Sequence, residues 1–190
     1  MMFDPTDAPL RDTMERWMEV ALDEARIALN TGEAPIGAAL FGIDGEVLGR
    51  GHNTMMASGS PVAHAEINAF TAAAGSCVPG TRLYMVSTLE PCVMCTGASM
   101  QAGVGTIIYG LEAPADSGTR RVKAPQSPGA TSPEVIGNIA AAESRALFTR
   151  WLKLHDAADP TRKAQRDFIE QLLALTANTT ESSSNPVGAA

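Results

Sequence analysis

Two short segments constrain this chain more than any other feature, because together they carry three metal-type donors and one spare carboxylate. His64-Ala65-Glu66 is followed, after a gap, by Pro91-Cys92-Val93-Met94-Cys95. Structural zinc is usually closed by four protein ligands, whereas catalytic zinc keeps three and leaves the fourth position to water. The fold must therefore bring both segments together, and the count of three donors indicates a metal held for chemistry.

The spacing of the two cysteines favours a helix that begins near Pro91. Residues three apart share a helix face, and the positive N-terminal end of a helix favours thiolates. Two thiolates and a neutral imidazole balance the charge of Zn²⁺, which lowers the pKa of a bound water toward about 7. The sequence therefore predicts zinc on His64, Cys92 and Cys95.

Glu66 is not needed as a ligand and is predicted to be the catalytic proton carrier. In hydrolytic deamination a proton leaves water as it attacks the amino-bearing ring carbon, a proton enters a ring nitrogen, and another reaches the departing amine. One carboxylate can serve each transfer in turn. The order H-x-E, then P-C-x-x-C, is the signature of zinc deaminases that act on cytosine or adenine rings.

Each half of this pattern alone has an ordinary explanation. A lone C-x-x-C also occurs as a redox pair, and a lone H-x-E occurs by chance on helix surfaces. Their occurrence together, in this order and with a proline before the first cysteine, favours the metal site. Cys77 has no neighbour at metal spacing and is expected to be a free thiol.

The length of 190 residues suits one well-buried core and is short for two domains. We expect an N-terminal extension over 1–10, a single zinc deaminase domain over 11–177, and a disordered tail over 178–190. No apolar run approaches a membrane span, and no basic and apolar leader pattern begins the sequence. The expected location is the cytoplasm, with no membrane partner.

The formal net charge of −7, with only 14 Lys and Arg residues, disfavours a polyanionic partner. Arg120, Arg121 and Lys123 are a candidate basic patch, but a solvated loop is the preferred interpretation. A small nucleobase or nucleoside is therefore the expected partner.

Periodicity and turn residues predict an alternation of helices and strands. Strand, helix and strand between 81 and 110 imply a parallel pair with a right-handed crossover, whose helix N-terminus and strand C-termini converge on one sheet edge. Both halves of the zinc site fall at that edge. The predicted order is helix 11–31, a hairpin of strands 36–42 and 46–51 turning at Asp44-Gly45, helix 64–74, strand 81–87, helix 92–102, strand 105–110, a surface loop 111–132 that forms a pocket wall, strand 134–137, and helices 139–155 and 160–176.

Beyond these motifs, residues from about 10 to 155 resemble the cytidine and deoxycytidylate deaminase superfamily, in the branch of guanine deaminases and bacterial tRNA adenosine deaminases. The resemblance includes the segments 33–38, 51–53 and 88–98 (EAPIGA, GHN and TLEPCVMCTGA). It implies a three-layer α/β/α fold with a central mixed five-stranded sheet, a homodimer or larger assembly, and the zinc and proton-shuttle roles given above. It also implies substrate contacts from the Asn53 amide, the backbone around Ala65, and the pocket positions Pro35 and Ile36.

The segment after Gly110 departs from both groups of relatives. The tRNA enzymes carry a pattern like Gly-Ala-Arg-Asp-Ala-Lys-Thr-Gly-Ala, whereas this chain has Ala113 at the Asp position and no Lys; basic residues are also absent from 167–178. The Phe-Asp-Asp of guanine deaminases is missing too. Glu112 or Asp116 is the candidate to replace the carboxylate that reads a guanine-type amine.

We therefore predict a zinc-dependent hydrolytic deaminase that releases ammonia from a free aminated nucleobase or nucleoside, a guanine-type purine in particular. The alternative is a tRNA adenosine deaminase that forms inosine, favoured by the run 89–95. A third class is a non-catalytic zinc-stabilised binding protein, against which Glu66 argues because folding alone does not require that carboxylate.

Overall fold

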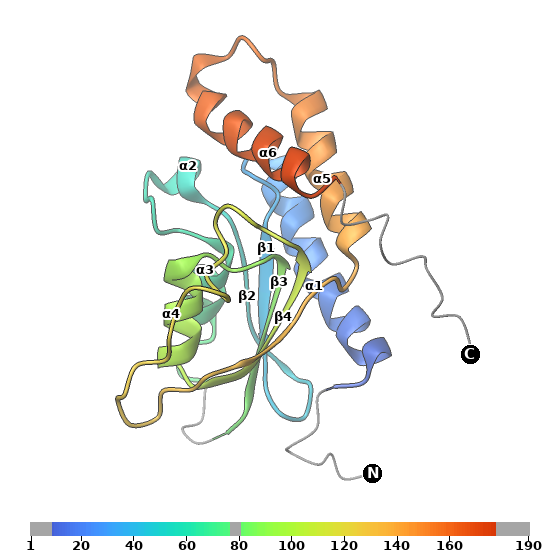
Figure 1. The fold of residues 1–190 in the computed structure, drawn as a ribbon. Coiled ribbons are helices and arrows are strands. Elements are labelled where there is room, and N and C mark those ends of the chain that lie inside the picture. The colour runs from blue at the N-terminus through green and yellow to red at the C-terminus, as the bar shows by residue number, and fades with distance from the viewer. Residues whose placement is uncertain (1–8, 77–80, 178–190) are drawn as a thin grey trace, which may run out of the picture.

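A mixed five-stranded sheet lies between two layers of helices in the computed structural model, which describes residues 9–76 and 81–177 (Figure 1). The strand order is β2-β1-β3-β4-β5. β1 pairs antiparallel with both β2 and β3, whereas β3, β4 and β5 run parallel. The predicted three-layer fold with a mixed sheet is confirmed. The strands are β1 (Gly37–Phe41), β2 (Val47–His52), β3 (Leu83–Leu89), β4 (Val104–Leu111) and β5 (Glu134–Ile136).

The helices divide between the two faces of the sheet. α1 (Arg11–Asn30) and α5 (Ala141–Leu154) cover one face, and α3 (Ala65–Ala72) and α4 (Val93–Gln101) cover the other (Figure 1). The 3₁₀ turn η1 (Pro160–Arg162) leads into α6 (Lys163–Leu175), which packs on α5. The short helix α2 (Met55–Ser58) was not predicted from the sequence.

The β1–β2 hairpin was predicted with a two-residue turn at Asp44-Gly45, but the connection is longer. It runs over residues 42–46, closed by hydrogen bonds from Gly42 N to Glu46 O and from Gly45 N to Gly42 O, both 3.0 Å long. Gly45 has φ of 80°, a conformation that glycine adopts at little cost. The register also shifts between Leu40 and Phe41, so the strands are offset by a bulge before the turn begins.

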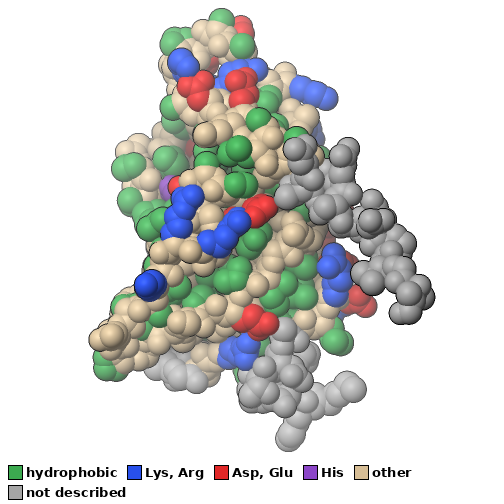
Figure 2. Space-filling model, viewed as in Figure 1, with side chains coloured by type: hydrophobic (Ala, Val, Ile, Leu, Met, Phe, Trp, Pro, Cys, Tyr) green, Lys and Arg blue, Asp and Glu red, His purple; other side chains and the backbone are tan. Residues whose placement is uncertain are grey.

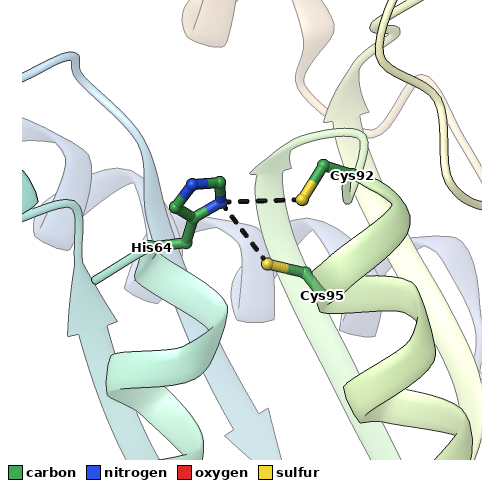
Figure 3. A group of neighbouring side chains, drawn as sticks. All are labelled: His64, Cys92 and Cys95. Atoms are coloured by element: carbon green, nitrogen blue, oxygen red, sulfur yellow. Dashed lines mark hydrogen bonds between the residues drawn. The ribbon is translucent and has the colours of Figure 1, made fainter. Parts of the chain in front are cut away.

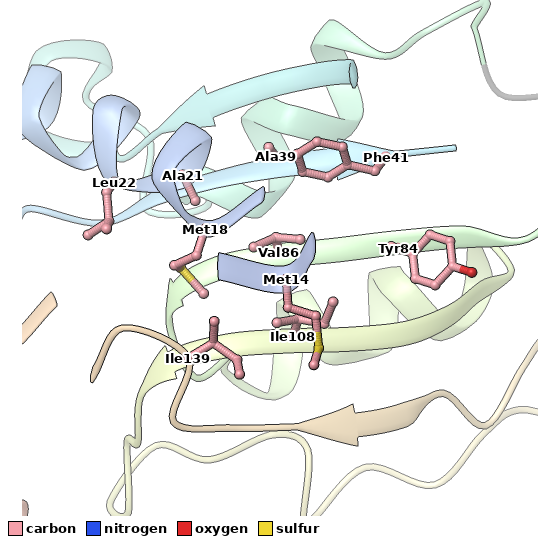
Figure 4. Close-up of a cluster of buried hydrophobic side chains, with 10 residues drawn as sticks. All are labelled: Met14, Met18, Ala21, Leu22, Ala39, Phe41, Tyr84, Val86, Ile108 and Ile139. Carbon is pink, nitrogen blue, oxygen red and sulfur yellow. The ribbon is translucent and has the colours of Figure 1, made fainter. Parts of the chain in front are cut away.

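The apolar stripe of α1 is buried against the sheet, as its spacing predicted. Met14, Met18 and Leu22 pack on side chains that alternate along β1 and β3, and Trp17 stacks on Phe41 with ring centroids 4.7 Å apart. Figure 4 shows this cluster between the helix and the strands. Because successive strand residues point to opposite faces, the neighbouring positions of β1 face α3 instead.

α3 lies unusually close to β2 because β2 contains glycines where the two elements cross. A Cβ atom on Gly51 would lie well under 3.0 Å from the backbone of Ala65 and Ala69. Gly49 makes a similar approach further along α3. This contact sets the position of the N-terminus of α3, where His64 lies.

The predicted β3–α4–β4 unit is confirmed as a parallel pair joined by a helix. Three of the predictions cannot be compared with the structure. Cys77, residues 1–8 of the predicted extension and the tail from 178 lie outside the described residues. No helix among the described residues combines the length and apolar character that crossing a membrane requires.

We predict that Gly51→Ala destabilises the protein by about 1–3 kcal/mol, because the added methyl group must push α3 away from β2. Urea unfolding at neutral pH measures the change. Gly97→Ala is the matched control, since a Cβ on Gly97 in α4 meets no atom within 4 Å and alanine is the better helix former. Equal stability of Gly51→Ala and the unmodified chain would contradict the close-approach argument.

Candidate active site

Three metal donors converge where α3 and α4 begin, at the carboxyl end of β3. His64 is the N-cap residue of α3 and Cys92 is the N-cap residue of α4, while Cys95 lies one turn further along α4. His64 Nδ1 is 3.6 Å from both the Cys92 and the Cys95 sulfur (Figure 3). The structure therefore brings together the three residues that the sequence selected as ligands.

The donor set fits a tetrahedral zinc ion. Zn–N bonds of about 2.0–2.1 Å and Zn–S bonds of about 2.3 Å, meeting at the tetrahedral angle, place nitrogen and sulfur roughly 3.6 Å apart. The observed Nδ1–Sγ separations match that value, and all three donor atoms lie within 4.8 Å of one another. The three residues would hold zinc and leave one coordination position for a reactant.

The pKa values of the donors show how strongly they interact without a cation. Hydrogen bonding from Cys95 and His64 holds the pKa of Cys92 well below its usual range, whereas the hydrogen bond to Cys92 and burial raise the pKa of Cys95. The bond with Cys92 also raises the pKa of His64. Cys92 therefore forms a thiolate readily, whereas deprotonation of Cys95 beside it is unfavourable. A divalent cation bound to both sulfurs would stabilise the second thiolate as well.

Glu66 lies in the first turn of α3, just past the donor histidine, and is 4% exposed. The Ser87 hydroxyl in β3 donates a 3.0 Å hydrogen bond to its Oε1. Burial raises the pKa of the Glu66 carboxyl. A carboxyl whose pKa lies closer to the working pH is better able both to accept and to give up a proton. A carboxylate with these properties beside a metal can carry protons between water and a substrate.

A pocket of about 340 Å³ opens in front of the donors. Four of the predicted substrate residues line it, namely Ile36, Asn53, Ala65 and Asp116, and two do not. Pro35 is buried between the lining residues Ala34 and Ile36, and Glu112 is bound to Arg120 instead. The described residues around the pocket are Ala34, Ile36, Asn53, Met55, Met56, His64, Ala65, Glu66, Leu89, Glu90, Cys92, Asp116, Ala164, Gln165 and Phe168.

Sequence reasoning missed the contribution of α2 and α6 to this pocket. Met55 and Met56 from α2 and Ala164 and Phe168 from α6 contribute apolar surface to it, and Gln165 of α6 adds a polar amide. The apolar periodicity of α6 predicted a helix but gave no information about what the helix covers. Only the docking of α6 on α5 places Phe168 over the site.

Glu90 is the second buried carboxylate near the donors, and it fastens the loop after β4. Its side chain has no exposed surface and accepts hydrogen bonds from the Ala113 N–H, 3.0 Å long, and from Ser117 and Thr119. Arg120 adds an ion pair at 3.0 Å. The loop was predicted as a surface segment that forms a pocket wall, and these bonds fold its first part into such a wall.

Backbone contacts join the same loop to the metal-ligand segment. Gly118 N donates to Pro91 O at 2.9 Å, and Cys92 and Ser117 form an isolated β-bridge. Asp116 is held at the rim of the pocket by these flanking contacts. The sequence carried a signal for Glu90 that went unused, since a charged residue between Leu89 and Pro91 in an apolar strand end requires buried partners.

Comparison with known proteins agrees with this site. The protein-family model of the cytidine and deoxycytidylate deaminase zinc-binding region matches residues 11–111 of this sequence. A tRNA-specific adenosine deaminase of Agrobacterium fabrum is 35% identical over 145 residues, which cover 72% of this chain and 92% of that protein. The tRNA(Ile)-lysidine synthase of Deinococcus radiodurans is 42% identical over 105 residues, which cover 54% of this chain but only 18% of that much longer protein.

Solved structures share the fold. One from work on A-to-I editing by tRNA:A34 deaminases at the wobble position of transfer RNA superposes with a TM-score of 0.58 and 35% identity, over 70% of this chain and 98% of that one. Guanine deaminase from Nitrosomonas europaea superposes with a TM-score of 0.61 over 79% of this chain and 96% of that one. Its identity of 20% limits that likeness to the fold.

We predict that Cys95→Ser loses most of the bound zinc, because it replaces a buried thiolate with a hydroxyl that is a poor zinc ligand. Metal analysis of the purified protein measures the zinc content, which we expect to be about one ion per chain before substitution. Cys77→Ser is the control and should keep its zinc. Full zinc content in Cys95→Ser would remove that residue from the donor set.

We predict that Glu90→Gln lowers the free energy of unfolding at pH 7 by about 1–3 kcal/mol, because the charge-assisted bonds to the loop are lost. Burial would raise the pKa of Glu90, but the bonds from Arg120, Ser117, Thr119 and Ala113 outweigh it and hold the pKa below its usual value. A carboxyl with a lowered pKa stabilises the fold above its unfolded pKa of about 4.3, and the contribution is lost as the pH falls through the folded pKa.

The deficit of Glu90→Gln should therefore shrink as the pH is lowered from 7 to below about 4, which urea unfolding across that range would measure. Glu112→Gln is the control, since Glu112 pairs with the same arginine nearer the surface and should contribute only about 0–1 kcal/mol. A deficit that does not change with pH would contradict the role given to the Glu90 charge.

Proposed function

The chain belongs to the cytidine and deoxycytidylate deaminase family of zinc-binding proteins, and from that premise we propose that it deaminates a small aminated purine, as a free base or a nucleoside. Family membership makes it a zinc-dependent hydrolytic deaminase. Its reaction replaces a ring C–NH₂ group with C=O, consuming water and releasing ammonia. The choice of substrate is the part that we propose.

The residues of the pocket can be given roles in that reaction. His64, Cys92 and Cys95 would hold zinc, which when bound supplies a water nucleophile at neutral pH. Glu66 takes a proton from the attacking water, gives it to a ring nitrogen, and carries a proton to the departing amine as the C–N bond breaks. Ser87 holds the Glu66 carboxylate beside the donors through its hydrogen bond to Oε1.

The observation that carries the proposal is the closure of the pocket by α6. Phe168 and Gln165 of α6 line the pocket together with Met55 and Met56 of α2, and its lining is mainly apolar. The volume of about 340 Å³ lies within the range of small-molecule pockets, roughly 300–1,000 Å³. A single ring system or nucleoside fits such a site without a larger polymer attached.

The arginines of the loop support a small substrate as well, because both are engaged within the protein. Arg120 is paired with Glu90 and Glu112, and Arg121 donates to Ala115 O and Pro114 O at 2.8 and 3.1 Å. In the view of Figure 2, the Lys and Arg side chains are scattered among Asp and Glu side chains and form no continuous basic surface. This arrangement offers little for binding phosphates, which rely on clustered cations.

The second candidate is deamination of adenosine in tRNA. It is favoured by the 35% identity that extends over 92% of the Agrobacterium fabrum enzyme. The absence of Asp at position 113 and the internal pairing of the loop arginines weigh against it. The predicted homodimer and cytoplasmic location belong to the proposal under either substrate.

Ammonia release tests the proposal directly. We expect the zinc-loaded enzyme to turn over at least one of guanine, guanosine, adenine and adenosine. Cytosine and cytidine complete the panel, and turnover of these pyrimidines alone would contradict the choice of a purine. Glu66→Gln should keep its zinc and lose activity by at least about 100-fold, since it cannot carry the proton. Glu46→Gln, which changes a carboxylate of the β1–β2 turn remote from the donors, is the control and should keep full activity.

Inactivity on every member of the panel with full zinc occupancy would refute the small-substrate proposal. Inosine formation in a tRNA anticodon stem, with binding that weakens steeply as salt is raised, would instead favour the second candidate. Full activity of Glu66→Gln would show that the proton path lies elsewhere.

A further inference from the structure

Glu33 is a buried carboxylate that takes no part in the proposed proton path. It is 1% exposed and lies just beyond α1, in the segment that leads into β1. Its Oε1 accepts a hydrogen bond from Ala57 N at 2.7 Å, and its Oε2 accepts bonds from Met56 N at 3.2 Å and from Asn53 Nδ2 at 3.1 Å. Three N–H donors thus surround a carboxylate at the edge of the pocket.

The backbone on which Glu33 lies is itself held firmly. Glu33 N donates to Ala28 O at 2.9 Å, and the carbonyl of the preceding Gly32 accepts hydrogen bonds from Trp151 Nε1, at 3.3 Å, and from Arg162. α1, α5 and η1 therefore all anchor this segment. The backbone from which the Glu33 side chain reaches Asn53 is therefore fixed by contacts to three other elements.

The carboxylate decides which end of the Asn53 amide faces the pocket. Both oxygens of Glu33 already accept backbone N–H groups, so the carboxylate acts as an acceptor and requires a donor from Asn53. Nδ2 of Asn53 takes that position. Within the described residues no hydrogen bond engages the Asn53 Oδ1, although the residue is only 2% exposed and lines the pocket.

We propose that Glu33 is a positioning residue that makes Asn53 a hydrogen-bond acceptor, so that the site selects a substrate that donates a hydrogen bond to Asn53 Oδ1. This inference rests on the proposed function and goes beyond it by assigning the polarity of a substrate contact. The donor is either a ring N–H or a sugar hydroxyl. A ring with only acceptor nitrogens at that edge leaves Oδ1 buried and unpaired, which costs binding.

Four related ligands distinguish the possible donors. Guanine carries a hydrogen on ring nitrogen N1, whereas 2-aminopurine has an acceptor there, and both keep the same 2-amino group. Guanosine and 2-aminopurine riboside add a sugar to each ring and remove an N–H from the five-membered ring. A preference for guanine rings identifies N1–H as the donor, a preference for nucleosides identifies a hydroxyl, and a preference for bases identifies the five-membered ring.

Glu33→Gln is the decisive variant. The new Nε2 can donate to the Asn53 Oδ1, which turns the amide so that Nδ2 faces the pocket. In the unmodified enzyme, one ligand of each compared pair is preferred, as a guanine ring over the 2-aminopurine ring or a base over its nucleoside. We expect Glu33→Gln to lower the ratio of kcat/KM values within the pair by roughly tenfold or more, with zinc content unchanged. Dissociation constants measured in the Glu66→Gln background should show the same loss of preference without any turnover.

Glu24→Gln is the matched control, since Glu24 is a mostly buried carboxylate that pairs with His52 at 2.8 Å and does not line the pocket. It should keep the preference of the unmodified enzyme. If Glu33→Gln does not fold, Asn53→Ala tests the same contact with the bonds from Glu33 to α2 retained, and it should also abolish the preference.

An equal loss of activity on all four ligands in Glu33→Gln, or a preference retained in Asn53→Ala, would overturn the inference by reducing Glu33 to a structural role. Ligands that bind with the predicted preference but release no ammonia would leave the inference standing, and the proposed function would then be refuted only if adenine and adenosine also released none. Ammonia release from the four ligands without any preference would support the proposed function and overturn the inference about Asn53.

Discussion

The structure depends on the meeting of two helix N-termini at one edge of the sheet. His64 caps α3 and Cys92 caps α4, so the two elements that carry the donors are also the two whose positive ends face the site. Two contacts fix this meeting: the close approach of α3 to the glycines of β2, and the crossover from β3 through α4 to β4. Both contacts are therefore needed to hold the three donor atoms within the short distances that zinc coordination requires.

Three buried carboxylates lie around the donors, and each has a different role. Glu66 faces the donors and is suited to move protons, Glu90 folds the loop after β4 into a pocket wall, and Glu33 orients Asn53 and α2. Burying a carboxylate is costly unless hydrogen-bond donors surround it, and here backbone N–H groups from separate segments supply them for Glu33 and Glu90. The same bonds that offset the cost of burial thereby fix the walls of the pocket.

Much of the architecture followed from local patterns. The stripe of α1, the alternation in β1 and β3, and the strand–helix–strand spacing each report a periodicity that burial imposes, and the structure agrees with them. Local patterns failed where long-range packing decides. The turn after Phe41 is longer than Asp44-Gly45 suggested, and α2 is held by the Glu33 carboxylate, more than 20 residues away in the sequence. Of the two acidic candidates, Asp116 lines the pocket and Glu112 pairs with Arg120.

The sequence by itself determined the chemistry, because the types and spacing of His64, Cys92, Cys95 and Glu66 are what zinc and proton transfer require, and such requirements are visible in a linear chain. The tertiary structure alone decided the shape and polarity of the pocket. Its walls combine α2, the loop after β4 and α6, and which atom of Asn53 faces the substrate depends on Glu33. No local pattern can report that choice, since it arises from hydrogen bonds between segments that only folding brings together.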